Sequence, residues 1–146
     1  IKSNQDRESE NINLDNLDIQ LKDTDESQGA LRCDNHYFKF IYNLELRNAE
    51  RSKNSVYVGI ISIDKLGYRQ LSEERLKDAM NPLLDIVYHK LRKGDVLTQW
   101  NDSQVLLLLY DLEEKYIEPV IKRVKDGFKE IIKDESIILN IKFKKI

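Results

Sequence analysis

The order in which apolar patterns follow one another is the feature that most restricts the fold of this chain. Residues 55–64 form a run rich in Val and Ile, which is typical of a buried strand. Apolar residues at helical spacing follow over 73–91, and two strand-like runs, 95–100 and 104–110, come next. A second helical pattern covers about 113–133, and strict alternation over 137–143 predicts a last strand. The expected order is strand, helix, strand, strand, helix, strand.

The two helical patterns have identifiable ends and faces. Ser72 is a good N-cap for the first, with acidic residues in the turn that follows, and Gly94 marks its expected stop after Arg92 and Lys93. Pro82 should kink this helix because it removes a backbone donor. The residues expected to face the core are Leu76, Met80, Leu83, Val87 and Leu91 in the first helix, and Ile117, Ile121, Val124, Phe128 and Ile131 in the second.

A further helix is predicted ahead of this pattern. Asp34 is its expected N-cap, and it should run to about Arg51, with Tyr37, Ile41 and Leu44 along one face and Phe38 and Tyr42 flanking them. The fold class predicted for the chain is therefore α+β: a ferredoxin-like βαββαβ antiparallel sheet, two helices on one of its faces, and an extra N-terminal helix.

Composition divides the chain into two parts. Residues 1–28 carry eight acidic and three basic side chains and read as an acidic linker, in which Leu14, Leu17 and Leu21 allow a short helix. Residues 29–146 form the expected single domain. Because the first residue is Ile1, we expect an excised piece of a longer protein.

Charge and hydropathy restrict the partners and the compartment. Residues 29–146 carry 21 basic and 18 acidic side chains, which is not the basic footprint of a nucleic-acid-binding module. No apolar run is long enough to cross a bilayer and no signal peptide is expected, so we expect no membrane contact. A single cysteine, Cys33, fits a reducing cytoplasm.

The segment between the two helices carries the first family resemblance. Arg92-Lys93-Gly94-Asp95 is followed by five residues and then by Asn101-Asp102-Ser103-Gln104-Val105, in which Asn101-Asp102 should make a tight two-residue hairpin turn. An Arg-x-x-Asp at this distance from a hairpin resembles the GGDEF domain of diguanylate cyclases. The resemblance places that family's first-strand metal aspartate on Ser62, its two glycines on Asn101 and Asp102, and its acidic pair on Ser103 and Gln104.

These replacements bear on catalysis. Phosphoryl transfer of this kind needs carboxylates that hold Mg²⁺, and a hydroxyl and an amide are poor substitutes for them. We therefore expect a chain that is not an enzyme and takes no cofactor. Asp64 and Asp102 could form a displaced metal site, although each also suits local hydrogen bonding at a strand end or in a turn.

Arg92 and Asp95 are the candidate ligand-binding residues. In cyclases an Arg-x-x-Asp here resembles the inhibitory site for cyclic di-GMP, with Arg gripping phosphate or guanine and Asp accepting from the base. The alternative is structural: Arg92 complements a helix C-terminus and Asp95 caps the turn after it. Cys33 and His36 have the spacing of half a metal site, and Trp100 either contacts a partner or packs on the hairpin.

A second resemblance lies in Gly29 to Ser52, GALRCDNHYFKFIYNLELRNAERS. This stretch is similar to the segment that opens a degenerate cyclase-like C-terminal domain in bacterial transcriptional activators of the antibiotic-regulator (BTAD-type) family. The resemblance implies a regulatory, non-catalytic domain that relays a signal to an upstream DNA-binding domain of the same polypeptide, or that pairs as a homodimer. The alternative is a sensor of a nucleotide or cyclic dinucleotide.

Overall fold

The computed structural model describes residues 11–22, 29–51, 53–67 and 70–146. Parts of the expected linker, residues 1–10 and 23–28, lie outside the described residues. Within 11–22 the expected short helix is present as α2 (Leu17–Leu21), and it buries none of its residues. No helix in the described ranges is long and apolar enough to span a bilayer.

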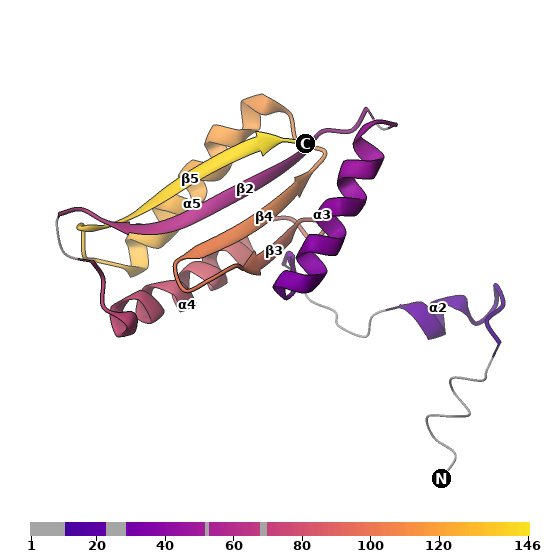
Figure 1. The fold of residues 1–146 in the computed structure, drawn as a ribbon, viewed down its shortest axis with the longest axis horizontal. Helices are drawn as coiled ribbons and strands as arrows, with labels where there is room; N and C mark the ends of the chain where they lie inside the picture. Colours follow the sequence, from indigo (N-terminus) through magenta and orange to yellow (C-terminus); the bar gives the residue numbers. More distant parts are fainter. Residues whose placement is uncertain (1–10, 23–28, 52, 68–69) are drawn as a thin grey trace, which may run out of the picture.

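A five-stranded sheet in the order β1-β3-β4-β2-β5 forms the centre of the domain (Figure 1). β2 (Val56–Lys65) lies between β4 (Gln104–Tyr110) and β5 (Ile137–Lys145), antiparallel to both. β3 (Val96–Gln99) pairs antiparallel with β4. The arrangement of these four strands confirms the predicted α+β, ferredoxin-like fold class.

One strand was not predicted. β1 (Leu31–Arg32) pairs parallel with β3 at the edge of the sheet, where Leu31 lies opposite Val96. The backbone N–H groups of Leu31 and Cys33 donate to the carbonyls of Asp95 and Leu97. Two residues give no alternation to detect, so the sequence carries no signal of this strand.

The main hydrophobic core lies between the sheet and two helices, α4 (Glu73–Lys90) and α5 (Ile117–Ile131), as expected. A short 3₁₀ helix, η1 (Glu114–Tyr116), precedes α5. Odd-numbered strand residues such as Ile61 and Leu107 face this core, since side chains alternate along a strand. In α5 the buried apolar residues are Val120, Val124 and Phe128; Ile131, which was expected to face inward, is exposed.

The start of α4 follows the prediction and its end does not. Ser72 caps the helix, its Oγ accepting a hydrogen bond from the backbone N–H of Arg75 at 3.2 Å. The helix continues through Pro82 but ends at Lys90, because Leu91 already has an extended backbone. Gly94, the expected stop, lies beyond the helix and has no positive φ.

α3 (Asn35–Ala49) covers part of the opposite face of the sheet, over β3 and β4 (Figure 1). Asp34 is its N-cap, as predicted, and accepts from the backbone N–H of Tyr37 at 2.9 Å. A second, smaller core of Phe38, Val96 and Leu108 lies beneath it. The apolar face predicted from Tyr37, Ile41 and Leu44 is not the buried one: Phe38, expected to flank it, is buried, while Tyr37 and Leu44 are exposed.

Candidate functional site

The β3–β4 hairpin is wider than the predicted two-residue turn. The backbone N–H of Trp100 donates to the carbonyl of Gln104 at 2.9 Å, and Asn101–Ser103 form the connection. Neither Asn101 nor Asp102 has a positive φ, so the tight turn that their residue types suggested is absent. The side chain of Asn101 closes the loop instead, with Oδ1 accepting from the N–H of Ser103 and Nδ2 donating to Oε1 of Gln104.

The structure brings Ser62 and Gln104 together. They are direct partners on β2 and β4, and Gln104 Nε2 donates to Ser62 Oγ at 3.2 Å. Asp64, two residues on, is exposed and lines a cavity of about 420 Å³ together with Gly67 and Ser103. Ser62 and the hairpin residues therefore gather at one end of the sheet, whereas Arg92 and Asp95 lie at the other end of β3 and β4.

The candidate metal ligands do not form a cluster. Across the described ranges there is no group of three or more His, Cys, Asp or Glu side chains placed to hold a metal ion. Cys33 is half-buried, and its Sγ lies 3.8 Å from the carbonyl oxygen of Leu97. Burial, and then the charge of Asp34, raises the pKa of the Cys33 thiol, which favours its protonated form.

Arg92 and Asp95 lie close together and bond to the strands around them. The Arg92 Nε atom is 3.6 Å from Asp95 Oδ2, and its Nη2 donates to the carbonyl of Tyr110. The carboxylate of Asp95 is buried and accepts two backbone N–H groups, those of Arg92 at 3.0 Å and Tyr110 at 3.2 Å. The Arg92 side chain as a whole remains more than half exposed. A ligand could reach Arg92, but both oxygens of Asp95 already have donors.

Polar contacts between α3 and β3 were not foreseen from the sequence. Asn35 accepts a hydrogen bond from Thr98 Oγ1 at 2.9 Å, and its Nδ2 donates to the carbonyl of Trp100 at 2.8 Å. The ammonium of Lys39 lies 5.6 Å from the centre of the Trp100 ring. Trp100, the residue that follows β3, therefore contacts α3, which is a packing role within the chain.

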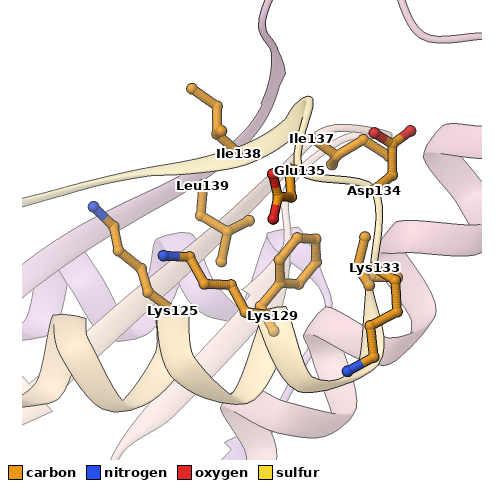
Figure 2. A pocket seen from close by; sticks show the side chains of 10 residues that line it. Lys125, Lys129, Lys133, Asp134, Glu135, Ile137, Ile138 and Leu139 are labelled. Carbon is orange, nitrogen blue, oxygen red and sulfur yellow. The ribbon is translucent and has the colours of Figure 1, made fainter.

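A pocket of about 720 Å³ lies between α5 and β5 (Figure 2). Phe128, Ile132 and Leu139 supply apolar walls, and Lys125 and Lys129 extend from α5 toward the strand that carries Ile138. Asp134 and Glu135 also line it, so its rim carries both basic and acidic groups. It contains none of the residues of the Arg-x-x-Asp or hairpin segments.

The outer side of α3 carries an apolar surface. Tyr37, Phe40 and Leu44 are 62%, 68% and 45% exposed. The spacing of three and four residues places them on one face of the helix, away from buried Phe38. We call this surface the α3 stripe. Exposed large apolar side chains gathered on one helix face are a mark of contact surfaces.

No protein-family model and no curated protein matches the chain. Solved structures with a similar fold are a DGC protein from Thermotoga maritima (TM-score 0.61, 14% identity, covering 80% of this chain and 81% of that one), and the GGDEF domain of DgcB from Caulobacter crescentus in complex with c-di-GMP (0.62, 7%, 86% and 79%). A third is diguanylate cyclase SiaD with its activator SiaC from Pseudomonas aeruginosa (0.61, 15%, 77% of this chain and 46% of that one). At these identities the likeness establishes a shared fold, that of GGDEF cyclase domains.

These similarities correct one expectation. The replacement of acidic residues at Ser62, Ser103 and Gln104 led us to expect a chain that is not an enzyme. That prediction is contradicted, because the solved structures that share the fold are described as diguanylate cyclases. The chain has an enzyme fold, and the residues at three positions of one motif are too narrow a basis for excluding catalysis.

Proposed function

We propose that this chain is a signalling domain of a cytoplasmic bacterial transcriptional regulator. In this proposal residues 29–146 form the domain, which makes a contact within the polypeptide or between subunits and so passes a signal to a DNA-binding domain located upstream in the same polypeptide. The similarity of Gly29 to Ser52 to transcriptional activators supports the setting. The GGDEF-like fold supports a signalling role, and one protein of that fold is crystallised with a protein activator.

The observation that carries the contact role is the α3 stripe. α3 is the first helix within residues 29–146, and the stripe leaves three large apolar side chains in solvent. By contrast, the side chains of Asn101, Gln104 and Asp95 are hydrogen-bonded within the chain. Burial of exposed apolar surface against a partner is the main favourable contribution to the free energy of protein association.

A transcription reporter driven by the polypeptide that carries this domain tests the proposal. Phe40→Glu should lower reporter output several-fold, because it places a charge in the centre of the stripe while leaving the buried face of α3 untouched. Ile131→Glu is the matched control, since Ile131 is a similarly exposed apolar residue on α5. Equal output from both variants, or the absence of a DNA-binding domain upstream, would refute the proposal.

GTP turnover is measured in parallel, because the fold is shared with cyclases. Purified chain is incubated with GTP and Mg²⁺, and product is followed by chromatography. Turnover that depends on the hairpin, shown by its loss in a Ser103→Ala variant, would place the chain's function at the β2–β4 end of the sheet. The reporter result would then have to be explained by product formation, and the contact role would be withdrawn.

The second candidate function is a nucleotide sensor that binds through Arg92 and Asp95. The observation in its favour is the exposed side chain of Arg92 beside the Asp95 carboxylate. Against it, a base that donates to Asp95 would compete with two backbone N–H groups. Calorimetry with cyclic di-GMP decides: binding lost in Arg92→Ala supports the sensor, and no heat at millimolar ligand removes it.

A further inference from the structure

The residues along the exposed face of α3 are spaced so that the face can pair with the same face of a second copy. Tyr37, Phe40, Leu44 and Arg47 follow one another at intervals of three, four and three residues along an exposed helix face. This is the spacing of the seam positions in a coiled coil. When two such helices lie antiparallel, each seam position of one type faces the other type on the second helix. The order of the residues therefore decides whether the face can pair with a copy of itself.

We propose that the α3 stripe is a two-fold, antiparallel contact with a second copy of this chain. The proposal rests on the proposed contact function of α3 and names the partner. In this arrangement Phe40 of each copy meets Leu44 of the other, and both contacts are apolar. Tyr37 of each copy meets Arg47 of the other, which places a guanidinium over an aromatic ring. The same surface of both copies forms the interface, as a two-fold arrangement requires.

The residues beside the seam are complementary too. His36 and Glu50 flank the stripe at equivalent positions about four helical turns apart, and the antiparallel arrangement places His36 of one copy near Glu50 of the other. Among the described residues, neither Arg47 nor Glu50 has an ion-pair partner within the chain, and both are exposed. A parallel arrangement would instead put Arg47 against Arg47 in the seam, and these two guanidinium groups repel.

Sedimentation equilibrium of the full chain tests the contact. The mass should rise toward twice that of the single chain as concentration approaches the order of 500 µM, since a contact of two or three helical turns is small and weak. Phe40→Glu should remain a single chain throughout, because it would bring two carboxylates into the apolar centre. Ile131→Glu should associate like the original chain. A chain that stays single, or association that survives Phe40→Glu, would overturn the proposal.

Crosslinking tests the antiparallel direction. In a Cys33→Ser background, Asn43→Cys places one thiol beside the seam close to the two-fold axis, where it meets the same residue of the second copy. A short bismaleimide should then join two chains. Arg47→Cys should crosslink poorly, because in the antiparallel arrangement its counterpart lies about 15 Å away along the helix pair. The reverse result would indicate parallel helices and contradict the pairing of Tyr37 with Arg47.

The two proposals can fail separately. A chain that remains single at all concentrations, with reporter output that still falls on Phe40→Glu, removes the second copy as the partner and leaves the contact role. A dimer broken by Phe40→Glu with unchanged reporter output keeps the interface and removes the proposed function.

Discussion

Asp95 is the residue on which the end of α4 and the hairpin strands depend most. Its buried carboxylate accepts N–H groups from Arg92, which follows the helix, and from Tyr110, which ends β4. The sequence offered two roles for it, a ligand contact and a turn cap. Its hydrogen bonds fit the cap, while the ligand role remains a prediction. Burial could not be read from four residues, because it depends on the strand that pairs beside them.

Replacing Asp95 with Ala should lower the free energy of unfolding by about 2–3 kcal/mol, because two buried N–H groups lose their acceptor. Asp102→Ala is the matched control: its side chain is exposed, and a change within about 0.5 kcal/mol is expected. Urea denaturation followed by circular dichroism measures both. A loss for Asp95→Ala no larger than that of the control would show that the carboxylate is dispensable.

Tyr110 gives the fold a predictable response to alkali. Its hydroxyl donates to Glu45 Oε1 at 3.1 Å, and burial, followed by the charge of Glu45, raises the pKa of Tyr110 above its usual value. Because the folded-state pKa is the higher one, the protonated hydroxyl stabilises the fold below about pH 10, and this contribution is lost above it.

Stability should therefore fall more steeply from about pH 10 upward in the original chain than in Tyr110→Phe. Unfolding by urea at a series of pH values measures this, and ultraviolet titration should show a late-ionising component that Tyr110→Phe lacks. Identical slopes for the two proteins would mean that Tyr110 does not ionise differently in the folded chain.

At the scale of the elements, the contact between β2 and β5 requires a residue without a side chain at position 59. Gly59 lies opposite Phe143, and a Cβ on Gly59 would come 2.3 Å from the Phe143 ring. The ring thus covers the strand where β2 has no side chain. Packing of this kind belongs to a pair of strands far apart in sequence, so neither strand pattern predicted it.

Gly59→Ala should destabilise the chain by about 1–3 kcal/mol through overpacking. Gly94→Ala should be close to neutral, because no atom lies within 4 Å of its added Cβ and its φ is not positive. Phe143→Leu in the Gly59→Ala background should recover part of the loss, measured as a double-mutant cycle by urea denaturation. Additive effects of the two substitutions would show that they do not share the contact.

Strand and helix order could be predicted because each long element carries its own period. What was missed depends on the surroundings of an element. The inward face of α3 centres on Phe38 because the helix lies over Val96 and Leu108, and the exposed residues Tyr37 and Leu44 are equally apolar in sequence. The end of α4 at Lys90 likewise depends on Leu91 packing into the main core, not on the glycine that follows.

At the scale of the whole molecule, the sheet separates two cores of unequal size. α4 and α5 cover one face with most of the buried residues, while α3 covers the other over β3 and β4. The resemblance assigned Ser62 and Gln104 to one site, and the structure places them side by side at one end of the sheet. Whether that end supports chemistry could not be predicted from residue types at three positions, because the fold itself is that of cyclases.

Removing residues 1–26 should change the free energy of unfolding by less than about 0.5 kcal/mol, because α2 buries none of its residues. Cutting beyond Gly29 should cost more, since Gly29 is buried beside the ring of Tyr88. Urea denaturation of the two shortened chains tests the domain boundary at residue 29. A large loss from the first truncation would mean that the acidic segment belongs to the folded domain.

The two-residue strand β1 is the point at which the N-terminal segment is attached to the sheet. A pull arriving through the N-terminal segment would act first on the hydrogen bonds that Ala30, Leu31 and Cys33 make to Tyr88, Asp95 and Leu97. Asp95 and Leu97 belong to the Arg-x-x-Asp turn and to the first strand of the hairpin. Tension on β1 would therefore act directly on these two residues. Peeling of this edge would loosen that region and uncover the part of the main core that contains Ala30.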